Sequence, residues 1–212
     1  PLAAIKNNMR RNTIGTFIIL TAGLISQACA QDNAYEQKLA LDFLNRYMEG
    51  IEQFDDELID HFPSTVQQRK DFSYVTPAGA SSIGMAYMFF SHEVDSASFD
   101  EVLERLEINE IPWYNSRDTS LILVNDTVDY TAMVEGVPIP NFERYEGDFG
   151  INRKYLPERF KIYVLEALPG KYLKKHELPI NDNLPSNWRH GYSRVIAVNE
   201  KQQELLYWTC VW

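Results

Sequence analysis

The densest group of side chains that could do chemistry lies near the C-terminus, in the stretch NWRHGYSR at residues 187–194. An aromatic ring beside cations can stack on a sugar, and an arginine can clamp a carboxylate through two parallel hydrogen bonds. Loops carry such functions more often than core strands do, so this stretch is the first candidate for a ligand site. The alternative is a structural lead-in to the next strand, in which the tryptophan fills the edge of the core. The candidate residues are Trp188, Arg189, His190, Tyr192 and Arg194.

Two other groups of polar residues could bind a metal or move a proton. His92, Glu93 and Asp95 lie close together in sequence, but adjacent residues of a strand point to opposite faces, which favours a polar turn. Asp56 and Asp60 are one helical turn apart and could act as an acid–base pair or bind calcium, although acidic helix faces are usually only solvated. The sequence therefore predicts no metal site and no cofactor, and it identifies no catalytic residue.

Several large enzyme classes leave no trace in the sequence. It contains no glycine-rich phosphate loop, CxxC, HExxH, GxSxG or EF-hand loop. Only two cysteines are present, Cys29 and Cys210, and the second lies in an apolar, aromatic stretch. A single cysteine in such a stretch is typically a small buried hydrophobe, so we expect Cys210 to be structural.

The N-terminal region has the three parts of a secretory signal peptide. Arg10 and Arg11 follow Met9, and no charged residue occurs from 12 to 30. Residues 1–8 are predicted to be an upstream extension, 9–30 the signal peptide and 31–212 one globular domain. A transmembrane anchor is the alternative, but the apolar core at 14–25 has 12 residues, whereas a spanning helix needs about 20.

Two cleavage sites compete at the end of this segment. The small residues around Cys29 suit an ordinary signal peptidase that cuts before Gln31. Alternatively, Cys29 resembles the lipidated cysteine of a bacterial lipobox, although Ser26 and Gln27 depart from that pattern. The polar AQDNA that follows suits a short tether, and we favour the lipoprotein reading. The expected location is the periplasm, outer membrane or cell surface, with an N-terminal lipid on Cys29.

Length and charge restrict the class of partner. Removal of about 30 residues leaves one ordinary domain with enough apolar residues for a core. Residues 31–150 carry 24 acidic and 7 basic side chains, whereas residues 151–212 carry 6 and 10. A mature chain this acidic has no electrostatic reason to bind nucleic acid. An envelope protein or a glycan is the expected partner.

The hydrophobic pattern predicts helices first and strands later. A helical stripe runs from Ala34 to about His61, with Gly50 as a possible break, and a second helix is capped by Ser98. TSLILVN at 119–125 reads as a strand, with TVDYTAMVEG at 127–136 as a possible partner, and FKIYVLEA at 160–167 as another strand. YSRVIAVN and ELLYWTCVW predict a C-terminal β-hairpin across a loop of four residues. The expected fold is α+β, with N-terminal helices packed on a mostly antiparallel sheet.

The ending LPSNWRHGYSR…LLYWTCVW resembles the C-termini of small, uncharacterised exported bacterial proteins, a resemblance that brings no activity with it. Together with Cys29 it indicates a small exported lipoprotein. The expected function is a lipid-anchored, non-catalytic binding or accessory module of the envelope. One alternative is a secreted hydrolase acting on glycan or peptidoglycan through His190 or His92. A further alternative is an immunity or inhibitor-type protein that blocks a basic partner with its acidic face.

Overall fold

The computed structural model describes residues 35–212 apart from 36, 65, 67–70, 83, 142–159 and 174–177. The predicted upstream extension, signal peptide and lipidation site at Cys29 lie outside the described residues. The chain divides into two compact units, residues 1–45 and 46–212. The account below concerns the second unit.

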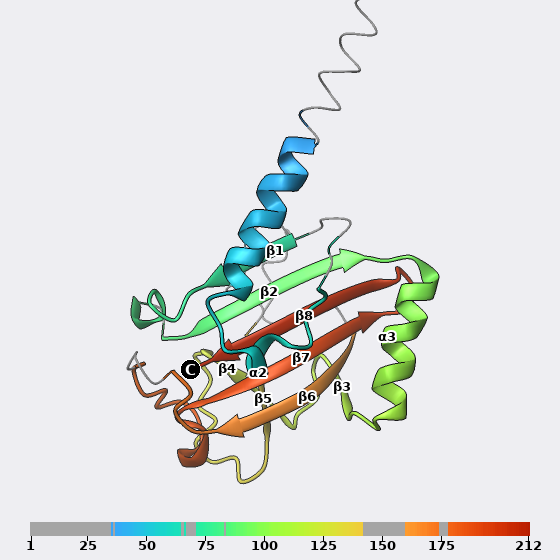
Figure 1. Ribbon diagram of the computed structural model, residues 1–212. Coiled ribbons are helices and arrows are strands. Elements are labelled where there is room, and N and C mark those ends of the chain that lie inside the picture. Colours follow the sequence, from blue (N-terminus) through green and yellow to red (C-terminus); the bar gives the residue numbers. More distant parts are fainter. Residues whose placement is uncertain are drawn as a thin grey trace, which may run out of the picture. The chain divides into compact units, whose positions relative to one another are not determined.

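A six-stranded sheet, antiparallel throughout, forms the centre of this unit, in the order β1-β2-β8-β7-β6-β3 (Figure 1). Its middle is the hairpin of β7 and β8, so the predicted C-terminal hairpin is confirmed. The α+β prediction is confirmed as well, because helices come before most of the sheet. The strands are β1 (Asp71–Val75), β2 (Ala86–Glu93), β3 (Trp113–Asn115), β6 (Lys161–Pro169), β7 (Gly191–Asn199) and β8 (Glu204–Val211).

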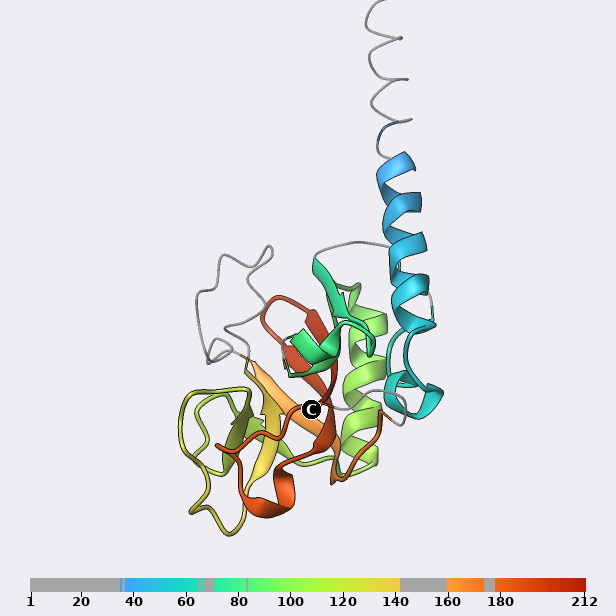
Figure 2. The same ribbon diagram turned by 90° about the vertical axis from the view of Figure 1, so that its left-hand side faces the viewer.

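The sheet is buried on both faces, which we name after two neighbouring residues of β8. The Trp208 face also holds Cys210 and packs in one apolar cluster with β4 (Leu121–Val124) and with Ile139 of β5 (Val137–Pro140). The Tyr207 face lies on the other side, and residues 46–63 cover it. Figure 2 shows β4 and β5 on one side of the sheet and the α2 segment on the other. Strand alternation therefore sends each side chain of β7 and β8 into one of two cores.

The pairing of β4 differs from the sequence prediction. We expected residues 127–136 to be its partner, but they form turns, and β4 instead pairs in parallel with β5. Parallel neighbours need a connection of a dozen or more residues, and residues 125–136 supply it. Pro138 and Pro140 have no N–H to donate, which suits this short two-stranded sheet because neither strand needs a second partner.

The predicted N-terminal helix is broken. The first helix covers 37–51, and a separate short helix, α2 (Asp56–Ile59), follows it. The break comes just after Gly50, as the sequence suggested, and it has a packing reason. A Cβ at Gly50 would lie 2.9 Å from Cζ of Phe72 on β1, so the helix end needs glycine to approach the sheet.

Aromatic contacts hold this segment on the Tyr207 face. The ring of Tyr47 lies 5.2 Å from Phe90 of β2 in an edge-on arrangement, and its hydroxyl donates to Pro63 O at 2.6 Å. Phe62 packs on Tyr207 with ring centroids 6.0 Å apart. Aromatic pairs with these geometries add stability beyond the area that they bury.

Helix α3 (Ser96–Ile108) is present as predicted, but its cap differs. The N-cap is Asp95, whose Oδ1 accepts from Ser98 N at 3.0 Å and whose Oδ2 accepts from Ser98 Oγ at 2.8 Å. The prediction of Ser98 as the cap is therefore wrong by three residues. Asp95 is the better acceptor for an exposed helix N-terminus because it carries the charge that the helix dipole favours there.

Gly191 at the start of β7 provides a test of this packing. Its backbone exchanges two hydrogen bonds with Trp212, and a Cβ there would lie 2.8 Å from Leu168 O and 2.8 Å from the Trp212 indole. Gly191→Ala should lower the free energy of unfolding by about 1–3 kcal/mol, measured by urea denaturation. Gly79→Ala is the control, since its Cβ would meet Thr76 Oγ1 at 3.5 Å, and its effect should stay within about 0.5 kcal/mol. Equal losses in the two variants would contradict this account.

Candidate functional site

The five residues of the predicted loop site do not act as one group. Tyr192 and Arg194 lie in β7 and point to the Tyr207 face, since they pair in register with Val211 and Thr209. Trp188 lies in a short 3-10 helix, η3 (Ser186–Trp188), and packs against the apolar cluster of the Trp208 face. Its carbonyl accepts from the Trp212 indole at 2.8 Å. Trp188 therefore packs on the Trp208 face, whereas Tyr192, the other aromatic residue of the predicted site, lies on the Tyr207 face.

The remaining two residues of the loop, Arg189 and His190, lie between these faces. Arg189 is exposed and His190 is half-buried. Their backbones tie the loop to its surroundings: His190 O accepts from Gly170 N at 3.0 Å, and Arg189 O accepts from Asn181 N at 3.3 Å. A ligand role for their side chains stays a prediction.

Arg194 joins side chains from three separate segments. One guanidinium nitrogen, Nη2, donates to Asp60 Oδ1 just after α2, and Nη1 donates to Glu166 Oε2 of β6 at 3.4 Å. The hydroxyl of Tyr192 donates to the same Glu166 oxygen, and Tyr172 packs edge-on against Tyr192 with ring centroids 4.4 Å apart. We call these five residues the Arg194 cluster. The arginine does clamp carboxylates, but they belong to this chain.

The cluster is partly open to solvent. The Arg194 side chain is 15% exposed, whereas Glu166 and Asp60 are 38% and 60% exposed. Burial and the hydrogen bond to Glu166 raise the pKa of Tyr192, so this phenol stays protonated and acts as a donor. The Asp60 ion pair contributes less than about 1 kcal/mol because water screens it. The cluster therefore combines a fixed cation with carboxylates that a ligand could reach.

His61 lies directly behind Asp60, with 3% of its side chain exposed. Its Nε2 lies 3.0 Å from the Trp208 carbonyl, and because a carbonyl only accepts, Nε2 must carry the proton. Burial, together with the positive charges of Arg194 and Arg105, lowers the pKa of His61 to about 3. The ring is thus neutral, and Nδ1 is an acceptor. It lies 4.0 Å from Asp60 Oδ1 and has no hydrogen-bond partner among the described residues.

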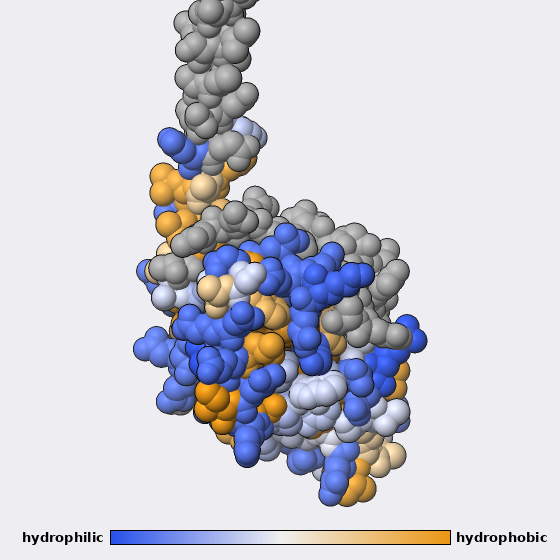
Figure 3. Space-filling model, turned by 90° about the vertical axis from the view of Figure 1, so that its right-hand side faces the viewer, coloured by the Kyte–Doolittle hydropathy of each residue, from blue (hydrophilic) through white to orange (hydrophobic). Residues whose placement is uncertain are grey.

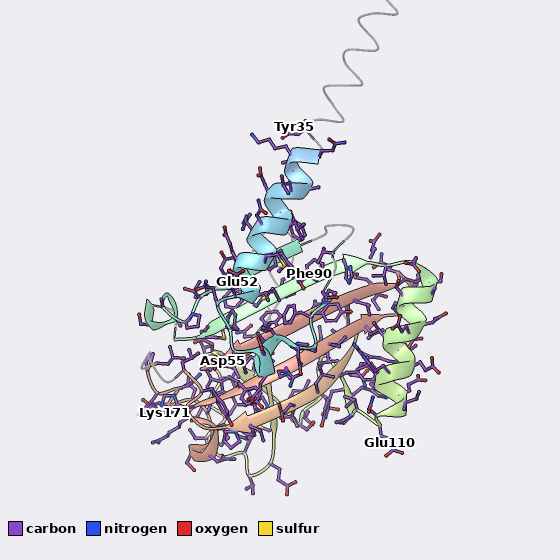
Figure 4. All side chains as sticks on the ribbon, in the orientation of Figure 1. Tyr35, Glu52, Asp55, Phe90, Glu110 and Lys171 are labelled. Atoms are coloured by element: carbon purple, nitrogen blue, oxygen red, sulfur yellow. The ribbon has the colours of Figure 1, made fainter. Side chains whose placement is uncertain are left out.

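Among the described residues, three further polar atoms of this face lack a hydrogen-bond partner. Two of them are Nε of Arg194 and Oγ1 of Thr209, whose residues pair in register across β7 and β8, and the third is Nε2 of His92 on β2. Figure 4 labels Asp55, at the start of α2, and Phe90 of β2, both on the viewer's side of the sheet. Unpaired buried polar atoms are uncommon in folded proteins, and a group of them beside a charged cluster is typical of a binding site rather than of a core.

The other predicted polar groups are not combined in this way. His92 is buried among the rings of Phe90 and Tyr207, and burial lowers its pKa to about 4. Glu93, the last residue of β2, is exposed. Asp95 serves as the cap of α3. Within the described residues, the His92 side chain has no carboxylate partner.

Cys210 and the acidic pair complete this comparison. Cys210 is buried on the Trp208 face, its sulfur lies 3.4 Å from Ser193 Oγ, and burial raises the pKa of the thiol to about 12. A thiol in this state is a poor nucleophile. Asp56 lies one turn before Asp60, yet of these two only Asp60 joins the Arg194 cluster.

The sequence analysis missed Glu166 and Tyr172 as members of the Arg194 cluster and His61 as the residue beside Asp60. Glu166 carries a weak signal, because it is a charged residue inside an otherwise apolar predicted strand. His61 and Tyr172 carry none, since each lies in a connecting segment far in sequence from Arg194. Asp60 was considered, but for a pairing with Asp56.

Among the described residues, no group of three or more His, Cys, Asp or Glu side chains could hold a metal ion. No helix in the same part of the chain is long and apolar enough to cross a membrane. Comparison with protein-family models, curated proteins and solved structures finds no match.

The buried neutral His61 predicts how stability depends on pH. The pKa of His61 in the folded state is about 3, and in the unfolded chain it is about 6.5. The unfolded chain therefore takes up a proton below about pH 6.5 that the folded chain refuses, so stability falls as the pH drops toward 3. One such group accounts for up to about 1.4 kcal/mol per pH unit.

His61→Gln should remove this contribution, because glutamine can still donate to the Trp208 carbonyl but does not titrate. Urea unfolding at a series of pH values from 6.5 to 4 should show a shallower decline for this variant than for the wild type. The pKa of His92 is also lowered, but His92 is present in both the wild type and the variant, so its contribution to the pH dependence cancels in the comparison. His190→Gln controls for the loss of a loop histidine. Parallel curves for His61→Gln and the wild type would show that His61 does not titrate in this way.

Proposed function

We propose that the protein is an exported, lipid-anchored binding module of the cell envelope that acts without catalysing a reaction, and that it binds its ligand at the Arg194 cluster. The observation that carries this proposal is the cluster itself. Charged and aromatic side chains from α2, β6 and β7 meet there on a rigid sheet, and its carboxylates are open to solvent. Sites on strands hold their groups more precisely than sites on loops do.

The geometry favours a binding module over the hydrolase alternative. That alternative requires His190 or His92 beside a carboxylate, and in the described residues neither side chain has such a partner. His61 does lie near a carboxylate, but burial and the positive charges of Arg194 and Arg105 lower its pKa to about 3, so its free Nδ1 is a weak base at neutral pH. An effective general base has a pKa near the operating pH. The alternative of an immunity or inhibitor-type protein with an acidic face keeps some support, because the acidic residue Asp60 belongs to the cluster.

The anchor is proposed from the sequence. An apolar segment with a basic start precedes Cys29, and the polar AQDNA follows it. An acyl chain contributes about 0.8 kcal/mol for each buried methylene, so two or more chains on one cysteine hold a small domain at a membrane. The binding surface would then act close to the bilayer surface.

Fractionation of the producing cell tests the anchor. The protein should occur in the membrane fraction, and its intact mass should correspond to a chain that begins at Cys29 and carries acyl groups. Cys29→Ser should lose both the acyl mass and the membrane association. A soluble wild-type chain that begins at Gln31 would overturn the anchored function and bring diffusible roles forward.

Site-specific cross-linking tests the binding surface in the same cells. A photoreactive residue at Lys171, which is exposed and adjoins Tyr172, should give a discrete adduct with an envelope component, and Glu166→Gln should remove it. Figure 4 labels Lys171 near the end of the sheet where β6 ends. The control position is Lys201, which is also exposed and lies in the hairpin loop between β7 and β8. The same adducts from both positions would contradict a specific surface.

A further inference from the structure

We propose that acid releases residues 54–62 from the sheet and that His61 is the proton acceptor that drives this opening. These residues, which include α2, are called the cover segment from here on. The opening goes beyond the binding function above, because it is a movement within the fold and depends on no ligand. Three features support it: the attachment of the segment, the charges around His61 and the burial of the His61 ring.

The cover segment is held on the Tyr207 face by apolar packing and by polar contacts at one end. Its buried apolar side chains are those of Phe54, Leu58, Ile59 and Phe62. Within the described residues, two polar contacts join the segment to the sheet. The His61 ring donates to the Trp208 carbonyl, and Asp60 pairs with Arg194. The polar attachment therefore depends on two neighbouring residues, one of which is a histidine.

The charges around His61 oppose a proton on its ring. The carboxylate of Asp60 is already paired with Arg194, and its Oδ1 lies 4.0 Å from His61 Nδ1. Two cations, Arg194 on β7 and Arg105 on α3, act against a second positive charge here. Figure 3 shows the α3 side of the molecule, where hydrophilic side chains predominate. The ring thus has cations on two of the elements around it.

The other titratable groups of this face do not offset the two arginines. Burial raises the pKa of Tyr207, which packs against the cover segment, to about 12, so its phenol stays neutral in acid. Burial likewise raises the pKa of Tyr47. Burial lowers the pKa of His92 on β2 to about 4. Glu166 on β6 is already bound by the side chains of Arg194 and Tyr192.

The burial of His61 connects proton uptake to movement. Only 3% of the side chain is exposed, so the ring must leave this environment to reach water. The pKa of His61 is about 3 in the closed form and about 6.5 once the ring is solvated. Between these values the open form takes up a proton that the closed form refuses, so acid favours opening. From pH 7 to pH 5 the opening equilibrium should rise about 25-fold.

The opening would change one face of the sheet and leave the other as it is. Arg194 would lose its Asp60 partner, and Tyr207 would lose the ring of Phe62 that packs on it. The Trp208 face would stay closed, because β4 and Ile139 of β5 pack on it from the opposite side. The transition is therefore a local opening, which proteins undergo at a lower free energy than global unfolding.

Amide hydrogen exchange of the mature protein, as purified from the producing cell, tests the opening. The reporters are the amides of Leu58, Asp60 and Phe62, whose hydrogen bonds lie within residues 55–62. A single helical turn is not stable alone in water, so these amides lose protection when the segment leaves the sheet. After correction for intrinsic exchange rates, their protection should fall about 25-fold from pH 7 to pH 5.

The amides of β8 distinguish local opening from global unfolding. At both pH values the reporter amides should exchange faster than those of β8. Their exchange should also depend more weakly on added urea, because a local opening exposes less surface than global unfolding does. Exchange of both groups of amides at the same rate and with the same urea dependence would overturn the proposal.

Variants identify His61 as the proton acceptor. His61→Gln can still donate to the Trp208 carbonyl but does not titrate, so its reporter amides should lose less than about threefold in protection over this pH range. Asp60→Asn is the matched control. It removes the neighbouring polar contact, which should lower protection by less than about fivefold at each pH, but it should keep the acid response. His92→Gln, which removes a buried histidine of the sheet itself, should keep it as well.

The remaining outcomes also decide. Reporter amides that are equally protected at pH 7 and pH 5 in the wild type would overturn the proposal. An acid response that persists in His61→Gln, or that disappears equally in His61→Gln and His92→Gln, would overturn it too. If His61→Gln does not fold, the pH and urea dependence of the wild-type amides decides.

Discussion

The β7–β8 hairpin is buried on both faces, and this constraint organises the rest of the molecule. Antiparallel sheets commonly leave one face in water, which lets polar and apolar residues alternate along a strand. Strand β8 does not alternate in this way, since Tyr207, Trp208 and Cys210 are all buried. Two separate coverings are therefore required. The β4–β5 pair covers one face, and residues 46–63 cover the other, which is why a helix must stop at Gly50 and turn onto the sheet.

His61 connects this covering segment to the sheet. Its Nε2–H donates to the Trp208 carbonyl in a region from which water is excluded, where a hydrogen bond is strong and its loss is costly. In the part of the chain that the structure describes, the same burial leaves Nδ1 without a donor. A core chosen only for stability would place an apolar side chain here, since a half-satisfied polar group is worse than none. The retained acceptor beside Asp60 is consistent with a binding function.

Local patterns predicted the parts of the fold that depend on neighbouring residues. Two runs of β-branched and aromatic residues on either side of a four-residue loop predicted the hairpin of β7 and β8, and helical periodicity predicted α3. The errors occur where distant segments decide the outcome. The partner of β4 is β5, because a parallel pairing depends on the return path of the chain and not on either strand's own sequence. The sequence of β2 combines Met and Ala, which suit a helix, with aromatic residues that suit a buried strand, and pairing with β8 makes it a strand.

The site illustrates the same limit at the level of single side chains. Arg194 shares its face of β7 with Ile196 and Val198, so the alternation already marks an arginine at an inward-facing position. A charge at such a position requires a partner, because an unpaired ion is not stable in a core. The sequence contains thirty acidic residues, and nothing in it identifies which of them is the partner of Arg194. Only the fold brings Asp60, which follows α2, and Glu166 of β6 to the same guanidinium, so the members of the cluster are identified by tertiary structure and not by any local pattern.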